Sequence, residues 1–354
     1  MLERAAYCPI LHTRLAETKA LYQLPAAAKD RLFPLLVARP WANAKQLSRT
    51  WEKVAEAIGD RRFGLDLDRT KFGVPSSRPA NAQFNLLFEP AGGYRAYYDM
   101  IDSMPYAVPV FQIDRGEILE IDDQIKNIAQ MERGAILRIR HGSLINPANA
   151  IDLIIDILPD LAVFIDVGWS NHILERELWA SSLIKRLTDA RSDVELVVSG
   201  SSFPASFSEI ASRGEIEVQE RYLYSSLTRA HNQANIIYGD WGSTRPPTID
   251  STPMRNIPRI DLPLVSEWVS FRQIKDKDEN YEQIASRVIN DPMWNDQIKI
   301  WGTYLINATA GGLPGSINSP ASAAAARINI HLYKQANFGL VELLPDGEEP
   351  FTDD

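Results

Sequence analysis

The chain has 354 residues, of which 45% are hydrophobic and 23% charged, and its formal net charge at pH 7 is −9. This composition is typical of a globular protein with a sizeable core, and it does not indicate disorder. The surplus of carboxylates argues against binding of a nucleic-acid backbone over the whole surface.

Three features of the sequence bear on the cellular location of the protein. They are its cysteine content, the N-terminal segment and the length of its apolar runs. Cys8 is the single cysteine, so neither an intramolecular disulfide nor a thiolate metal site can form. No apolar signal-peptide core follows Met1, and no apolar run approaches the roughly 18 residues that a membrane span needs. We therefore expect a cytoplasmic protein with no membrane partner.

Short apolar runs alternate with longer amphipathic stretches over the first 240 residues. The runs are rich in β-branched and aromatic residues, and most are continuous rather than alternating with polar residues. Such runs are typical of strands that are buried on both faces. They lie at 7–11, 32–38, 63–67, 107–113, 135–139, 161–167, 194–200 and 235–240.

The stretches between these runs have helical periodicity. Leu47, Trp51, Val54 and Ile58 recur at three- and four-residue spacing, and Gly59 ends that pattern as a C-cap would. Together they predict a helix within 44–59. Similar patterns predict helices over 15–24, 118–131, 146–158 and 170–187.

Eight apolar runs separated by helices predict an α/β fold with a parallel sheet. The count of eight and the near-even spacing favour a (β/α)8 barrel of the TIM type over an open doubly wound sheet. The barrel would span residues 1–247, with 75–83 as an insertion after the third strand. We expect residues 248–354 to form a C-terminal α+β extension packed on the barrel, with an acidic tail over 345–354.

The pattern of the chain changes after residue 247. The stretch "RIDLPLVSEWVSFRQI" (259–274) mixes prolines with alternation and predicts an edge strand or hairpin. A helix is predicted over 279–290, and a second helix or a strand over 297–311. Residues 311–335 begin as a loop rich in glycine and proline and end as an alanine-rich helix.

In a (β/α)8 barrel, functional residues gather at the C-terminal ends of the strands. Charged and polar residues follow the predicted strands here, and opposite charges alternate around the ring. This pattern indicates the lining of a pocket. The residues are His12, Arg39, Asp66, Asp68, Gln112, Asp114, Arg138, Arg140, His141, Asp166, Ser199, Ser201, Ser202, Asp240, Ser243 and Arg245.

Two aspartates occur in similar settings, "FIDVGWS" and "YGDWGS". If Asp166 and Asp240 face one mouth, they can act as general acid and base, hold a divalent cation or pair with nearby arginines. The structural alternative is that each aspartate caps the next turn or forms a buried ion pair. Considered together, they favour a ligand site with Asp166 and Asp240 as candidate catalytic residues. The candidate ligand-binding residues are His12, Arg138, Arg140, Ser199, Ser201 and Arg245.

A second candidate is "VVSGSSFP", where serines and a glycine precede a predicted helix as in a small anion cradle. It lacks the glycine spacing and lysine of a P-loop and the paired glycines of a nucleophile elbow. A serine-rich turn explains it equally well. The histidines have no metal-ligand spacing, so no histidine-based zinc site is expected. No metal ligands are assigned, and the sequence identifies no cofactor.

The chain resembles the beta protein family of temperate phages, phage satellites and bacterial mobile elements. The resemblance covers most of the chain in matching order, and its more specific segments are "SGSSFP" and "YGDWGSTRP"; others are "YCPILHTRLAETKAL", "FIDVG" and "RINIHL". It implies a cytoplasmic protein that is encoded beside a growth-inhibiting partner, relieves that partner's toxicity and takes part in phage defence. It implies no catalytic residues. Family members often have lysine at the position of His12 and glutamate at that of Val37, so any chemistry at these positions differs here.

Two functions are the leading hypotheses, and a housekeeping barrel hydrolase is a third, weaker alternative. The first is a barrel in a phage-defence or toxin-control system whose mouth binds, with or without turnover, a small anion such as a nucleotide or another phosphate compound. The second is a non-catalytic immunity or antitoxin-like protein that binds a toxic partner encoded nearby. The acidic surface favours the second, because it could face a basic toxin.

Overall fold

The computed structural model describes residues 1–2, 4–74, 78–113, 120–142, 154–155, 157–247, 257–274 and 277–340. Within these ranges, no helix combines the length and apolar character that a membrane crossing requires. The predicted helix over 146–158 lies largely outside them, as do the strand-end residue Asp114, part of the expected insertion and the acidic tail.

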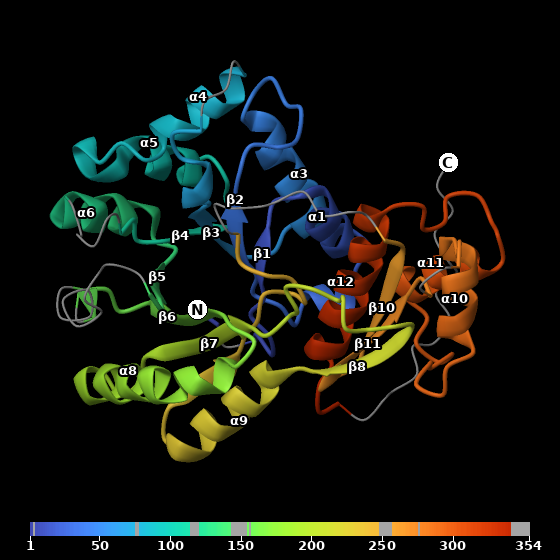
Figure 1. Ribbon diagram of the computed structural model, residues 1–354. Helices are drawn as coiled ribbons and strands as arrows, with labels where there is room; N and C mark the ends of the chain where they lie inside the picture. Colours follow the sequence, from blue (N-terminus) through green and yellow to red (C-terminus); the bar gives the residue numbers. More distant parts are fainter. Residues whose placement is uncertain are drawn as a thin grey trace.

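All eight apolar runs form strands, which are arranged in two parallel four-stranded sheets (Figure 1). The first sheet has the order β1-β2-β3-β4, and the second has the order β5-β6-β7-β9. The mixed α/β architecture with parallel sheets is therefore as predicted. The strands are β1 (Ile10–His12), β2 (Leu35–Ala38), β3 (Phe63–Leu67), β4 (Ala107–Pro109), β5 (Ala135–Arg140), β6 (Leu161–Trp169), β7 (Glu195–Ser201) and β9 (Asn235–Tyr238).

Backbone hydrogen bonds join the two sheets at both of their edges. At one edge, the amides of Cys8 and Ile10 donate to the carbonyls of Tyr238 and Asp240 at 2.9 and 2.7 Å. At the other edge, the amide of Phe111 donates to the carbonyl of Ile136 at 2.9 Å. At each edge the hydrogen bonds involve too few residues to form a continuous β-ladder, so the two sheets are counted separately.

Strand residues alternate between two apolar cores, as the two-residue period of a strand requires. One core is shared by both sheets and contains Leu35, Val37, Ile136, Phe164 and Val197. The intervening positions pack outward against the helices in a larger core that includes Leu36, Leu137, Ile165 and Leu196. Burial on both faces explains why the runs are continuously apolar.

Gly64 on β3 faces the shared core, where space is tight. A Cβ atom at this position would lie 2.4 Å from Cδ1 of Ile136, on the other sheet, and 2.8 Å from Cδ1 of Leu35. The glycine therefore allows side chains of β2 and β5 to meet across the interior.

Helices surround the strands (Figure 1). The predicted helix within 44–59 is α3, and that within 118–131 is α6. The predicted helix over 170–187 is a short 3-10 turn followed by α8. The helices of this part are α1 (Leu15–Tyr22), α2 (Ala26–Lys29), α3 (Ser48–Ile58), η1 (Arg69–Lys71), α4 (Pro79–Leu86), α5 (Ala91–Asp102), α6 (Ile121–Met131), η2 (Ile173–Arg176), α8 (Glu177–Ala190) and α9 (Gln219–Ala230).

Several elements were not predicted from the sequence, among them α2, α4, α5 and β8 (Arg213–Glu217). Helix α5 begins at Ala91 and contains Gly92 and Gly93 at φ of 65° and 67°, and paired glycines weaken a helical pattern. Strand β8 has mostly charged side chains, so it lacks an apolar run. It is the edge strand of a separate antiparallel sheet, where a polar face is ordinary.

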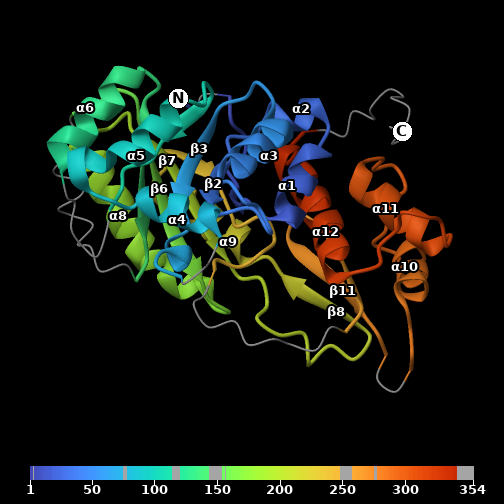
Figure 2. The same ribbon diagram turned by 90° about the horizontal axis from the view of Figure 1, so that it is seen from above.

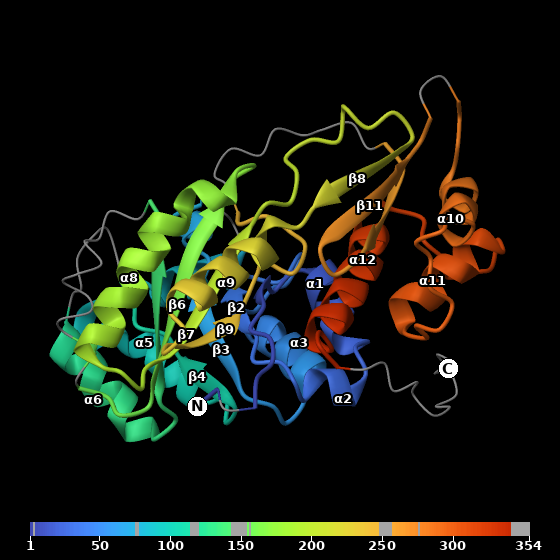
Figure 3. The same cartoon turned by 90° about the horizontal axis from the view of Figure 1, so that it is seen from below.

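The predicted hairpin over 259–274 is present as β10 (Arg259–Pro263) paired antiparallel with β11 (Glu267–Arg272), and β8 completes this sheet. The later predicted helices are α10 (Tyr281–Ile289), α11 (Trp301–Ala310) and α12 (Pro320–Ala336). Helix α12 packs between α1 and β10 (Figure 1). Figures 2 and 3 show α12 next to α1, with β11 nearby. Because β8 precedes residue 247 but pairs with β11, the division of the chain at 247 stays a prediction.

Candidate functional site

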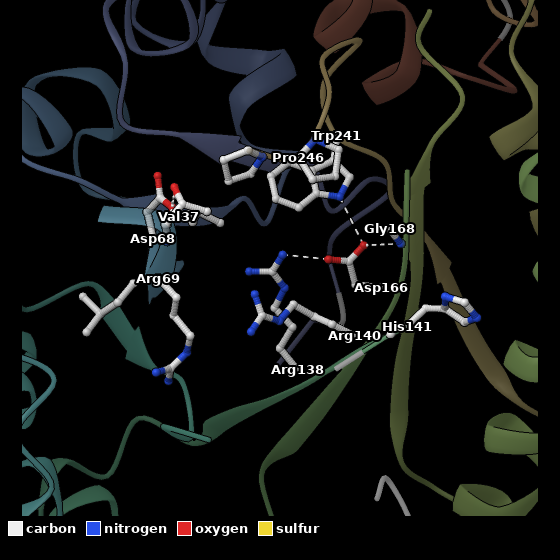
Figure 4. A pocket seen from close by; sticks show the side chains of 14 residues that line it. Val37, Asp68, Arg69, Arg138, Arg140, His141, Asp166, Gly168, Trp241 and Pro246 are labelled. Atoms are coloured by element: carbon white, nitrogen blue, oxygen red, sulfur yellow. Dashed lines mark hydrogen bonds and ion pairs between the residues drawn. The ribbon is translucent and has the colours of Figure 1, made fainter. Parts of the chain in front are cut away.

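A pocket of about 300 Å³ lies at the carboxyl ends of the parallel strands (Figure 4). Its walls come from residues that end or follow β2, β3, β5, β6 and β9. Of the candidate site residues, the pocket contains Arg138, Arg140 and Asp166. Other lining residues are Val37, Asp68, Arg69, His141, Trp241 and Pro246.

Arg138 and Arg140 both reach this pocket because they alternate along β5. Ile139, between them, points to the outer core. Figure 4 shows the two guanidinium groups side by side, and His141 directed away from them. The register of β5 and β6 also pairs Arg140 with Asp166, which brings a carboxylate beside the two cations.

Arg138 is held between two buried carboxylates. Its Nη1 donates to Oδ2 of Asp66 and its Nη2 to Oδ2 of Asp166, each at 2.7 Å. Burial opposes ionisation of Asp66, but the positive charges of Arg138 and Arg140 outweigh it and hold the pKa of this carboxyl below its usual value. The charge of Arg138 is thus compensated within the protein, and its role is to order the two aspartates.

Arg140 is close enough to Asp66 and Asp166 to be affected by their charges, but it forms no direct ion pair with either of them. Among the residues that the structure describes, its side chain has no hydrogen-bond or ion-pair partner. Burial and the neighbouring charge of Arg138 lower the pKa of Arg140 from its usual value. A cation held in this way is suited to an anionic ligand.

Asp166 is fixed by more than its ion pair. Its Oδ1 accepts hydrogen bonds from Nε1 of Trp241 at 3.1 Å and from the amide of Gly168 at 2.9 Å. Gly168 has φ of 71°, a conformation that favours glycine. The carboxylate therefore caps its own turn as well as pairing with Arg138, as the structural alternative expects.

Asp240 has the same turn but different surroundings. Its carboxylate accepts from the amide of Gly242 at 2.7 Å, from the hydroxyls of Tyr7 and Tyr238, and from Nε2 of His331 on α12 at 2.7 Å. Burial opposes its ionisation, but His331 and the two tyrosines outweigh it and lower the pKa of Asp240. Asp240 is not among the side chains that line the pocket, and the catalytic role of the two aspartates stays a prediction.

His12 and Ser199 are buried in the protein interior, and neither lines the pocket. The ring of His12 is 1% exposed and lies 5.3 Å from that of Trp241, centre to centre. Neither of its nitrogens has a hydrogen-bond partner in the described part of the chain, and the same holds for Oγ of Ser199. Burial and the charges of Arg14 and Arg39 hold the pKa of His12 well below its usual value, so the imidazole is neutral.

Ser201, at the end of β7, and Arg245, beyond β9, are not among the residues that line this pocket. Oγ of Ser201 donates to the carbonyl of Thr244 at 2.6 Å and accepts from the amide of Phe203 at 3.2 Å, so it supports local chain geometry. Arg245 lies 5.6 Å from the centre of the Trp169 ring and lines a second pocket of about 590 Å³.

Sequence reasoning did not select Glu17, which also lines the second pocket. Its side chain is buried, and burial raises its pKa although Arg14 lies 3.9 Å away. Glu17 lies in the first turn of α1, on a helix with no unusual pattern, so no signal in the sequence marks it. No group of three or more histidine, cysteine or carboxylate side chains in the described ranges is arranged to hold a metal ion.

Comparison with known proteins places the chain in a family. The Beta protein family matches residues 7–337. The chain is 27% identical to Protein beta of Enterobacteria phage P4 over 343 residues, which is 94% of this chain and 93% of that protein. No solved structure matches the chain. Because the match to the family covers nearly the whole chain, this protein belongs to the Beta protein family.

Proposed function

We propose that the pocket at the strand ends binds a small phosphate-containing anion, with Arg140 as the main binding residue. The observation that carries this proposal is the position of Arg140, which lines the pocket without a partner among the described residues while Arg138 beside it is neutralised. A bound anion would give the Arg140 guanidinium the direct partner that it lacks among the described residues. The volume of about 300 Å³ is within the range of small-molecule sites.

The carboxylates of the site favour phosphate ligands that also carry hydroxyl groups. Asp68 lines the pocket, and its Oδ2 has no hydrogen-bond partner in the described part of the chain. Its Oδ1 is used by Thr70. A sugar or nucleoside hydroxyl could donate to Oδ2, so a nucleotide or sugar phosphate suits the pocket better than inorganic phosphate.

The proposal includes closure of the two sheets into one (β/α)8 barrel of the TIM type, with this pocket as its mouth. The hydrogen bonds at both sheet edges and the shared inner core support closure. Amide hydrogen exchange tests it. In a closed barrel the amides of Ile10 and Phe111 exchange as slowly as those in mid-strand, whereas exchange at the rate of exposed loops would contradict closure.

Calorimetric titration with a ribonucleoside monophosphate tests the binding site. We expect Arg140→Gln to weaken binding at least about tenfold, because a charge-assisted hydrogen bond to the anion is lost. Arg95→Gln serves as the control, since Arg95 is 71% exposed on α5 and its ion-pair partner Asp99 is also exposed. If both variants bind as the unaltered protein does, the pocket is not an anion site.

The resemblance to the family suggests a biological setting for this site, which is phage defence or control of a toxic partner. The curated relative is a phage protein. We propose that ligand binding at the mouth is required for phage defence or for control of the toxic partner. Arg140→Gln should then remain folded but fail to restore growth against the partner encoded beside it.

The alternative, an antitoxin-like protein that acts by binding a partner, is favoured by one surface. Leu174 on η2, Leu178 on α8 and Tyr222 on α9 are large apolar side chains with exposures of 40%, 84% and 49%, on elements that pack together. Under this alternative, Leu178→Asp abolishes protection against the partner and Arg140→Gln leaves it intact. The opposite pattern would support the ligand-binding function.

A further inference from the structure

The second pocket adjoins the first. Thr70, Pro246 and Pro247 line both, so the two share a wall at the end of β3 and in the segment after β9. Their volumes are about 300 and 590 Å³. Together they form a cleft that extends from Arg140 towards α1 and α12, which is longer than a single phosphate group requires.

The second pocket is strongly cationic, although the whole chain carries a net charge of −9. Among the described residues, the lining includes five cations and a single carboxylate, that of Glu17. One cation, Arg327, is neutralised by Asp261 at 2.8 Å. The others are Arg14, Arg39, Lys71 and Arg245.

The remaining cations are only weakly compensated. Arg39 lies 3.8 Å from Asp68, too far for a hydrogen bond, and Arg14 lies 3.9 Å from Glu17. Arg245 contacts the ring of Trp169, and burial lowers its pKa. Mutual repulsion among such groups is relieved by a bound anion, and several groups together require more than one negative charge.

We propose that the two pockets form one binding cleft for a ligand with two or more linked phosphoryl groups, an organic polyphosphate such as a nucleoside diphosphate or triphosphate. One phosphoryl group would lie beside Arg140 and the next beside Arg245 and Lys71. This inference rests on the proposed function, because the first phosphoryl group occupies the pocket proposed above. It adds the class of ligand and a second set of binding residues.

Titration with phosphate chains of increasing length tests the proposal. Inorganic phosphate, pyrophosphate and tripolyphosphate are compared by calorimetry at one ionic strength. We expect pyrophosphate to bind at least about tenfold more tightly than phosphate, because its second group reaches the second pocket. Arg245→Gln removes this gain and leaves phosphate affinity within about twofold, whereas Arg140→Gln weakens all three.

Control variants distinguish the loss of a positive charge at the second pocket from a general loss of folding. Arg245→Lys keeps the positive charge and should keep most of the gain with chain length, and Arg95→Gln should change nothing. If Arg245→Gln does not fold, Lys71→Gln replaces it, since Lys71 lines the same pocket.

The outcomes also separate the two proposals. Binding of phosphate that depends on Arg140, with no tighter binding of pyrophosphate, would overturn the polyphosphate proposal and leave the proposed function standing. A gain with chain length that survives Arg245→Gln and Lys71→Gln would also overturn it. If phosphate binding does not depend on Arg140, both proposals fail.

Discussion

Nε2 of His331 lies 2.7 Å from Oδ2 of Asp240, and both side chains are buried. The two residues are 91 positions apart in the chain. Their contact ties α12 to the turn that follows β9, the same turn from which Trp241 reaches Asp166. The C-terminal helix thus supports the wall of the candidate site through Asp240.

This relationship predicts that Asp240→Asn acts mainly on stability. Asparagine keeps one acceptor oxygen, but its NH2 group replaces the oxygen that faces Tyr238 and His331. Leaving buried donors without an acceptor costs about 1–3 kcal/mol of unfolding free energy. Urea denaturation measures the loss. Asp189→Asn is the control, because Asp189 is 63% exposed in a helical pair with Lys185 and should change stability by less than about 0.5 kcal/mol. A variant of Asp240 with unchanged stability and no ligand binding would instead support the catalytic role predicted from the sequence.

Arg138→Gln is predicted to destabilise the protein because it leaves Asp66 and Asp166 as buried charges without their cation. The expected loss of unfolding free energy is about 3–5 kcal/mol. The triple variant Arg138→Met, Asp66→Asn, Asp166→Asn removes all three charges and should recover a large part of that loss. Denaturation curves of the two variants measure their unfolding free energies. If the triple variant is less stable than Arg138→Gln, the loss of the ion pairs does not cause the destabilisation.

The pH dependence of stability is predicted to contain a contribution from Glu220. Burial and the negative charge of Asp240 raise the pKa of this carboxyl to about 7, although Ser202 donates two hydrogen bonds to it. Because the folded pKa lies above the unfolded one, the stabilisation is fully present below about pH 4.3. It is lost as the pH rises through about 7, and the change is on the order of 3 kcal/mol.

Denaturation at a series of pH values measures this contribution. Glu220→Gln resembles the protonated carboxyl and does not titrate, so its stability should change less over the same range than that of the unaltered protein. Equal slopes for the two proteins would show that Glu220 does not titrate in this window.

Gly64→Ala is predicted to destabilise the fold by about 1–3 kcal/mol, because the new methyl group would overlap Ile136 and Leu35. Adding Ile136→Val removes the closest atom and should recover part of the loss. Gly311→Ala is a matched control, since the nearest atoms there lie 3.7 Å or more from the added carbon. Thermal denaturation compares the three, and a neutral Gly64→Ala would mean that the shared core can expand.

The sequence by itself determined the strands and most of the helices of this protein. Burial on both faces requires a run of apolar residues, and that requirement is local, so the eight runs could be recognised one by one. The same two-residue period placed Arg138 and Arg140 on one face of β5, so their presence in one pocket was predictable. Strand β8 was not predicted, because it is stabilised by pairing with β11 and its own sequence has no apolar run.

Tertiary structure alone decided what each strand-end residue does. Asp166 and Asp240 stand in nearly identical segments and form the same turn, yet one pairs with Arg138 at a pocket and the other with His331 inside the protein. Glu17 and Arg245 meet around one pocket from opposite parts of the chain. A hydrogen bond or an ion pair depends on which distant groups arrive within about 3 Å, and no local pattern carries that information.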